Sequence, residues 1–192
     1  MLNTVAIIGA GPLGRWLALH AASGGFRVLL EDVMPNNLHH AQEFLRQQLG
    51  PDALANNGAG VVFVSTIEDA VRDADLAIDC VPDELESKLE IFCLLDRMAP
   101  PRTIFATPTT RLSIADLASC TYRADRCVAI VLEASSLAEG ANSRIELRST
   151  SKTSSETIVA VTHFWSRLGF TAEFAADPAE FLLTPTGLTA RQ

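Results

Sequence analysis

The stretch TVAIIGAGPLGRWLALHAASGGFRVLLED, residues 4–32, decides the fold. Its first run, Thr4–Ile8, is almost wholly apolar, which is typical of a parallel strand that is covered on both faces. The glycine-rich turn GAGPLG follows at residues 9–14, and apolar residues then recur at helical spacing until a glycine pair. A second apolar run, residues 27–30, leads to an acidic pair that ends at Asp32. This order predicts a βαβ unit that binds a dinucleotide.

Each glycine of the turn has its own task in such a motif. Gly9 permits the tight turn, Gly11 lets the backbone approach a pyrophosphate, and Gly14 lets the helix pack closely on the strand. Pro12 and Leu13 lie in the first turn of the helix, where free N–H groups bind phosphates. These residues are therefore predicted to contact the cofactor.

Asp32 follows the last glycine of the turn by 18 residues and is the expected ribose ligand. Its carboxylate would accept hydrogen bonds from the adenosine ribose hydroxyls and would repel a 2′-phosphate, so NAD(H) is favoured over NADP(H). Arg15 and Arg27 lie nearby and are expected to be solvated surface charges. The alternative that the motif leaves open is a domain of this fold that no longer binds a nucleotide.

Strands and helices continue to alternate along the rest of the chain. Further strands are expected at residues 61–64, 76–80, 103–106, 127–131, 144–147 and 170–174. Helices are expected at residues 38–49, after a Ser65–Glu68 capping box, from Leu85 until Pro100, at 113–119, and after a Thr153–Glu156 capping box. The pattern predicts an α/β fold of the Rossmann type, with a doubly wound, mostly parallel sheet in a single domain at residues 1–176. Residues 177–192 are expected to form a short tail.

Composition limits the possible partners. The chain has 192 residues with 15 Lys and Arg against 23 Asp and Glu, a net charge of −8, which disfavours nucleic acid. Its four cysteines have no CxxC spacing, so neither a zinc site nor a disulfide framework is expected, and they are interpreted as small core residues. The apolar runs are too short to span a membrane and no signal peptide is evident, which predicts a cytoplasmic protein.

With these motifs in place, the chain resembles the NAD-binding domain of the 3-hydroxyacyl-CoA dehydrogenase family from about residue 4 to residue 184. The likeness is strongest over residues 5–32 and in ADLAIDCVPD at 74–83, and it extends to TIFATPTTRLSI at 103–114 and FWSRLG at 164–169. The resemblance implies NAD as cofactor and a role in fatty acid metabolism. It also implies further cofactor contacts from Cys80, Val81, Pro82, Asp83, Lys88 and Thr107.

The chain departs from this family where the chemistry takes place. Family members oxidise the 3-hydroxyl of an acyl-CoA with a histidine base that a glutamate orients, and here Val131 occupies the histidine position. Loss of a general base costs about 10²–10⁴ in rate. Glu146 matches the orienting glutamate if a small gap is allowed, and Thr110 replaces a serine that hydrogen-bonds the substrate hydroxyl. Glu133 is an alternative base beside the vacated position, whereas the four histidines (His20, His39, His40 and His163) fall in helices.

Other family features are also missing. Pro108 stands where the family has an asparagine, and residues 181–184 lack a second asparagine that the family has there. The helical domain that closes the family's active site and forms its dimer is absent from the sequence. The first interpretation is an NAD(H)-binding sensor, regulator or subunit without the histidine-dependent activity. The alternatives are an active oxidoreductase on a 3-hydroxyacyl-CoA-like or smaller hydroxy substrate, completed by another subunit, and a partner-binding module. Self-association or a separate helical subunit is expected to cover the apolar surface left near the C-terminus.

Overall fold

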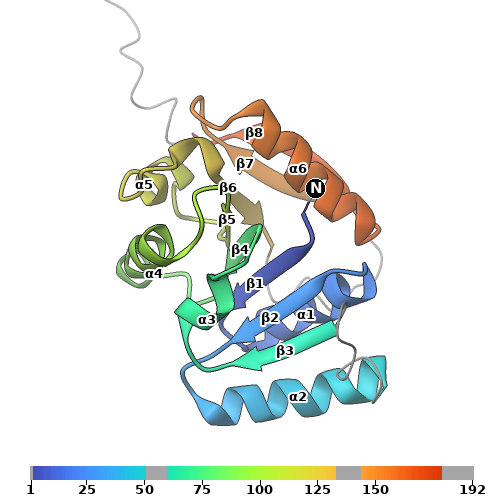
Figure 1. The fold of residues 1–192 in the computed structure, drawn as a ribbon. Helices are drawn as coiled ribbons and strands as arrows, with labels where there is room; N and C mark the ends of the chain where they lie inside the picture. Colours follow the sequence, from blue (N-terminus) through green and yellow to red (C-terminus); the bar gives the residue numbers. More distant parts are fainter. Residues whose placement is uncertain (1, 51–59, 133–143, 179–192) are drawn as a thin grey trace, which may run out of the picture.

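The computed structural model describes residues 2–50, 60–132 and 144–178, and these ranges contain a single eight-stranded sheet (Figure 1). The sheet order is β3-β2-β1-β4-β5-β6-β7-β8. The strands are β1 (Thr4–Ile8), β2 (Arg27–Glu31), β3 (Gly60–Val64), β4 (Leu76–Asp79), β5 (Ile104–Pro108), β6 (Cys127–Val131), β7 (Arg144–Ser149) and β8 (Thr171–Ala176). The first six strands are parallel, β7 is antiparallel to β6, and β8 is parallel to β7. The predicted single-domain, mostly parallel sheet of the Rossmann type is confirmed.

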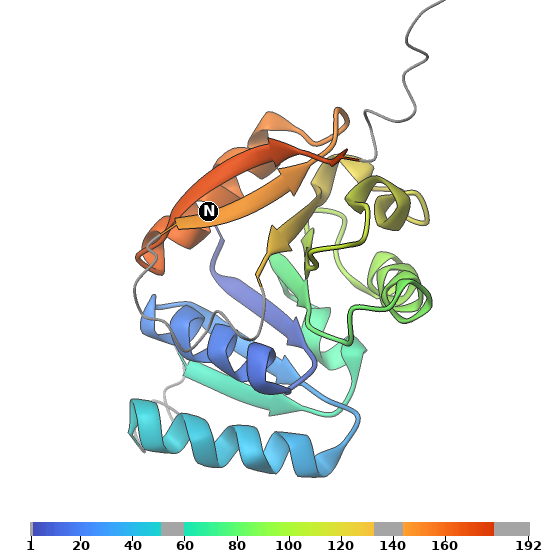
Figure 2. The ribbon, with the colours of Figure 1, turned by 180° about the vertical axis from the view of Figure 1, so that it is seen from behind.

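Helices cover both faces of the sheet, as the two opposite views show (Figures 1 and 2). The helices are α1 (Pro12–Ser23), α2 (Pro35–Leu49), α3 (Ile67–Val71), α4 (Leu85–Met98), α5 (Ile114–Ala118) and α6 (Ser155–Arg167), with a 3₁₀ turn at Ala124–Arg126. One apolar cluster joins the sheet to α1, α2 and α6, and a second joins it to α3, α4 and α5. Strand β1 is buried on both sides, which explains its unbroken apolar run.

Two capping predictions are wrong by one residue. The cap of α3 is Thr66 rather than Ser65, because the Thr66 hydroxyl accepts a hydrogen bond from the Asp69 N–H at 3.2 Å. The cap of α6 is Ser154 rather than Thr153, whose hydroxyl accepts from the backbone N–H of Thr150 at the end of β7. In both places two neighbouring hydroxyl residues offered a cap and the second one is used, while Thr153 instead donates to the carbonyl oxygen of Cys127 at 3.2 Å.

Two other expectations also need correction. Helix α2 begins at Pro35, three residues before the expected start, because a proline in the first turn needs no N–H partner and already has a helical φ angle. Of the four cysteines, Cys127 is buried in the core as expected, whereas Cys93 is exposed on α4, and all four are free thiols. No helix in the described ranges is both long enough and apolar enough to cross a membrane.

The topology brings the predicted site residues to one edge of the sheet. The six parallel strands all end at this edge, called here the carboxyl edge, and the connection from β3 returns across β2 and β1 to reach β4. Ligands of such sheets bind outside the carboxyl ends, where the strand order reverses. At the far end of the chain, the side chain of Asp177 accepts hydrogen bonds from Ser113 Oγ and the Ala115 N–H, so this residue is attached to the start of α5. The expected tail boundary stays a prediction, since residues 179–192 lie outside the described residues.

Candidate functional site

The glycine turn has the backbone geometry that the sequence motif requires. Gly9 has a φ of +103°, and its N–H donates to the carbonyl oxygen of Glu31 at 2.8 Å, which ties the turn to β2. A Cβ on Gly9 would lie 3.1 Å from the Cys80 backbone, and one on Gly14 would overlap the Gly9 carbonyl oxygen. A Cβ on Gly11, in contrast, would meet nothing within 4 Å. The turn is therefore closely packed toward the protein at two glycines and open at the third, which leaves room for a pyrophosphate.

Helix α1 begins directly beside this opening. Gly11 is its N-cap, Pro12 is its first residue, and no side chain hydrogen-bonds to the cap. Pro12 is exposed and Leu13 is half-buried against the core. The N–H groups of the first helical turn are thus left for a ligand, and an anion is favoured there by the helix dipole as well.

Asp32 is buried and already has three donors from the protein. Its Oδ2 accepts from the Ala10 N–H at 2.8 Å and from Asn37 Nδ2 at 3.0 Å, while Oδ1 accepts from the Met34 N–H at 2.8 Å. Each carboxylate oxygen can accept two hydrogen bonds, so Oδ1 keeps one position for a ribose hydroxyl. Asp32 therefore also joins the glycine turn to the start of α2. Sequence reasoning missed Asn37 as its partner.

Glu31, the residue before Asp32, is a second carboxyl group at this end of the edge. Only 5% of it is exposed. Burial and the neighbouring Asp32 charge raise the pKa of Glu31 to about 7. Its protonation state therefore changes near neutral pH, beside the place where the motif predicts the cofactor.

Lys88 holds together the ends of β4 and β5. Its Nζ lies 2.9 Å from Thr107 Oγ1, 3.3 Å from Asp79 Oδ2 and 3.3 Å from the carbonyl oxygen of Val81. Lys88, Asp79 and Thr107 are completely buried. Burial raises the pKa of Asp79, and the Lys88 ammonium opposes this rise. The direct role of Lys88 and Thr107 in this structure is to fix the turn after β4, and their predicted contact with the cofactor stays a prediction.

The turn after β4 presents an unpaired acceptor. Within the described residues, the buried Oδ1 atom of Asp83 has no hydrogen-bond partner, while the Asp83 carbonyl oxygen accepts from Arg111 Nη2 at 2.9 Å. Burial raises the pKa of the Cys80 thiol above its usual range, so the thiol is neutral. Pro82 is exposed on the same turn. The turn after β4 also packs on the glycine turn, because the Cys80 backbone lies 3.1 Å from a Cβ built on Gly9.

Thr110, Glu146 and the vacated base position lie together at the other end of the carboxyl edge. Val131 of β6 is the direct cross-strand neighbour of Glu146 in β7. The Glu146 carboxylate accepts from Arg148 Nε at 3.1 Å, and Arg148 Nη1 donates to the Thr110 carbonyl oxygen at 3.4 Å. Glu146 thus lies opposite a valine, and its carboxylate is hydrogen-bonded to the guanidinium of Arg148. Sequence reasoning missed Arg148, although its spacing of two residues from Glu146 on a strand places both on one face.

The histidines of the chain lie away from Val131 and Glu146. All four histidines are among the described residues. His20 lies in α1, where burial lowers its pKa, and His39 and His40 lie on α2 beside the opposite edge strand of the sheet. His163 lies on α6 at the amino ends of the strands. The alternative base Glu133 lies outside the described residues.

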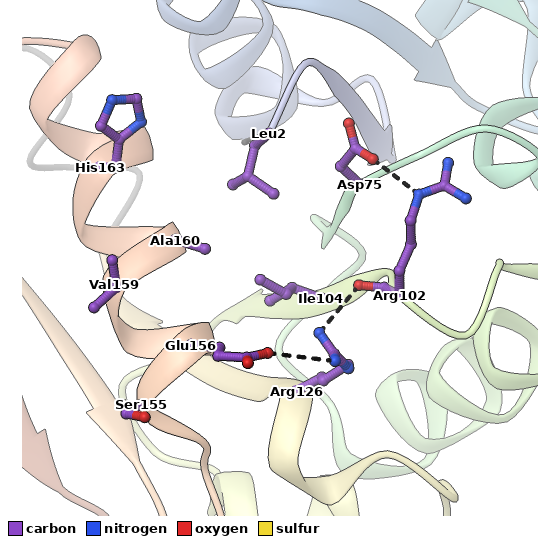
Figure 3. A pocket seen from close by; sticks show the side chains of 10 residues that line it. All are labelled: Leu2, Asp75, Arg102, Ile104, Arg126, Ser155, Glu156, Val159, Ala160 and His163. Carbon is purple, nitrogen blue, oxygen red and sulfur yellow. Dashed lines mark hydrogen bonds and ion pairs between the residues drawn. The ribbon is translucent and has the colours of Figure 1, made fainter.

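A cavity of about 630 Å³ lies at the opposite edge of the sheet from the predicted site (Figure 3). It lies between α6 and the amino ends of the strands, and it is lined by Leu2, Asp75, Arg102, Ile104, Arg126, Ser155, Glu156, Val159, Ala160 and His163. Its arginines pair with its own carboxylates, Arg102 with Asp75 at 3.1 Å and Arg126 with Glu156 at 3.9 Å. None of the residues predicted from the sequence lines it. Within the described ranges, no group of three His, Cys, Asp or Glu residues could hold a metal ion.

Comparison with known proteins identifies the relatives of this chain. The sequence model of the family described as "3-hydroxyacyl-CoA dehydrogenase, NAD binding domain" matches residues 4–173. A probable 3-hydroxybutyryl-CoA dehydrogenase of Bacillus subtilis is 32% identical over 136 residues, which cover 66% of this chain and 47% of the relative. The mitochondrial hydroxyacyl-coenzyme A dehydrogenase of Homo sapiens is 33% identical over 140 residues, covering 66% of this chain and 45% of the relative. The chain thus spans less than half the length of these relatives.

Solved structures share the fold over nearly the whole chain. A diketoreductase superposes with a TM-score of 0.78 at 29% identity, covering 91% of this chain and 64% of that one. The (S)-3-hydroxybutyryl-CoA dehydrogenase of Ralstonia eutropha gives 0.80 at 21% identity, covering 92% and 64%. The glycine turn, the open face at Gly11 and the uncapped start of α1 fit the cofactor that the matched domain binds. This chain belongs to the 3-hydroxyacyl-CoA dehydrogenase family through its NAD-binding domain, and its cofactor is NAD.

Proposed function

We propose that this domain binds NAD(H) and does not perform the histidine-dependent oxidation of 3-hydroxyacyl-CoA thioesters. One observation carries the proposal: the cross-strand neighbour of Glu146 is Val131, and the Glu146 carboxylate is hydrogen-bonded to Arg148. Valine cannot accept a proton, so no base stands where the resemblance places it. A sensor, a regulator or a subunit of a larger assembly would use the cofactor in this way.

The chain's own residues account for binding. The open face at Gly11 and the first turn of α1 receive the pyrophosphate, and the free acceptor position of Asp32 receives a ribose hydroxyl. The buried Lys88 holds the turn after β4 in place. When bound, NAD supplies hydride acceptance. The protein contributes position and electrostatics but no identified proton acceptor.

Two measurements on one sample test this proposal. Isothermal titration with NADH and with NADPH should give micromolar binding of NADH and much weaker binding of NADPH. Incubation with NAD⁺ and 3-hydroxybutyryl-CoA should give no increase in NADH absorbance above a protein-free control. Turnover at a rate typical of dehydrogenases, about 1–10³ s⁻¹, would show that another base replaces the histidine and would overturn the proposal.

An active oxidoreductase with a different substrate is the second candidate. Thr110 favours it, because its half-buried hydroxyl has no hydrogen-bond partner among the described residues and is free to bind a substrate hydroxyl. A relative in Mesorhizobium japonicum, 35% identical over 124 residues, is named 5-formyl-3-hydroxy-2-methylpyridine 4-carboxylate 5-dehydrogenase, so its named substrate is small and carries no CoA. Under this candidate, Thr110→Val abolishes NADH formation with the active substrate and leaves NADH affinity unchanged.

A further inference from the structure

Arg148 occupies a position that gives its guanidinium access to the catalytic end of the site. Its cross-strand neighbour in β6 is Ala129, and cross-strand neighbours place their side chains on the same face. The small alanine lets the long arginine side chain extend over β6 toward the end of β5. There Nη1 reaches the carbonyl oxygen of Thr110 at 3.4 Å.

The guanidinium keeps donors for a ligand. Nε is used by Glu146 and one Nη1 hydrogen by Thr110, whereas Nη2 has no hydrogen-bond partner in the described part of the chain. The Arg148 side chain is 19% exposed, so it is sheltered but still accessible. The Glu146 side chain is 48% exposed, so solvent screens its charge more than that of Arg148. A half-sheltered fork of N–H donors is suited to a carboxylate.

A second arginine, Arg111, lies close to Thr110 in the chain. Arg111 follows Thr110 in the chain, its side chain is 73% exposed, and its ion pair with Asp83 is long at 3.9 Å. Thr110 therefore lies next to Arg111 in the chain and contacts Arg148 through its carbonyl oxygen. A hydroxyl or carbonyl group beside a carboxylate that binds Arg148 would be within reach of the Thr110 hydroxyl.

We infer that this end of the site binds the free carboxylate of a small hydroxy or oxo acid, with Arg148 as its principal ligand and Thr110 at the adjacent oxygen. The inference rests on the proposed function, because it places the acid beside bound NAD(H). An acid of this kind differs from a 3-hydroxyacyl-CoA in lacking the CoA thioester. It would be the second ligand of an NAD(H)-binding sensor, or the substrate if the domain is active.

Titration of the NADH-saturated protein with acetoacetate tests the inference. Its matched ligand control is methyl acetoacetate, which has the same carbonyl groups without the charge. Acetoacetate is expected to bind at least tenfold more tightly than the ester. Arg148→Met should weaken acetoacetate binding by about tenfold to a hundredfold, the range expected for hydrogen bonds to a charged group, with NADH affinity unchanged within twofold.

Arg144→Met is the matched protein control, since Arg144 lies on the same face of the same strand and is 73% exposed. It should leave both affinities unchanged. Arg148→Lys keeps the charge without the fork and should give an intermediate affinity, which guards against misfolding of the methionine variant. Equal binding of acid and ester, no binding of acetoacetate, or full binding by Arg148→Met would overturn the inference. Failure of NADH itself to bind would overturn the proposed function instead, and titration of acetoacetate without cofactor would then decide the inference.

Discussion

The β1–β2 end and the β5–β7 end of the carboxyl edge differ in how well they match the residues that the family resemblance implies. At the β1–β2 end, the open glycine turn, the uncapped start of α1 and Asp32 all have the geometry that dinucleotide binding requires. At the β5–β7 end, a valine stands at the base position and Arg148 takes the carboxylate of Glu146. Both ends belong to the same sheet. The β1–β2 end has the residues that the resemblance implies for cofactor binding, whereas the β5–β7 end has a valine where the resemblance implies a histidine.

This difference shows how the two functions depend on sequence. Dinucleotide binding uses backbone N–H groups and a tight turn, which the packing of the whole domain maintains. Proton transfer depends on one side chain at one position, and a single substitution removes it while the strands stay intact. Val131 pairs with Glu146 as an ordinary strand residue, so the fold is the same whichever residue occupies this position.

The largest effect is expected at Lys88, which joins the ends of β4 and β5 in the middle of the carboxyl edge. Lys88→Met leaves the buried Asp79 carboxylate without its cation and should lower the free energy of unfolding by about 3–5 kcal/mol. Urea denaturation at pH 7 measures this, with the exposed Arg97→Met as control. Adding Asp79→Asn should recover part of the loss. A loss below about 1 kcal/mol would show that the pair does not hold the ends of β4 and β5 together.

A smaller effect, confined to the β1–β2 end, is expected from the titration of Glu31. Its folded pKa of about 7 exceeds its ordinary value of 4.5, so the folded state binds the proton more tightly than the unfolded state does. Stability is therefore greatest below pH 4.5 for this group and falls as the pH rises to about 7. Glu31→Gln should remove this fall and stabilise the protein at pH 8 by about 2–3 kcal/mol. Urea denaturation from pH 5 to 8.5, with exposed Glu43→Gln as control, would refute this if the two variants gave parallel curves.

The smallest effect separates cofactor binding from the rest of the edge. Asp32→Ala removes the ribose acceptor and should weaken NADH binding about tenfold, or 1.4 kcal/mol, while reducing the preference over NADPH. The control Asn37→Ala removes only the amide that donates to Asp32 and should leave NADH affinity within twofold. Isothermal titration of both variants measures the difference. If Asp32→Ala bound NADH as tightly as the unchanged protein, the carboxylate would have only its structural role.

Much of the fold and half of the site could be predicted from residues that act locally. The glycine turn and the strand–helix alternation depend on backbone conformation and periodicity, which neighbouring residues set. The positions of the caps at Thr66 and Ser154 could not be resolved, because adjacent hydroxyl residues compete and only the packed structure separates them. The contact of Arg148 with Thr110 was missed because it joins residues that are far apart in the sequence and that only the packed sheet brings together.

The sequence by itself determined the Rossmann-type fold, the family, the cofactor and the valine at the base position. Each of these follows from which residue types occur at fixed spacings along the chain. Only the tertiary structure decided that Glu146 lies directly opposite Val131, that Lys88 is buried against Asp79 and Thr107, and that the Glu31 pKa rises to about 7. The physical reason is that register, burial and charge pairing depend on which strands lie side by side. Those neighbours are set by the packing of the whole sheet and by no single segment of it.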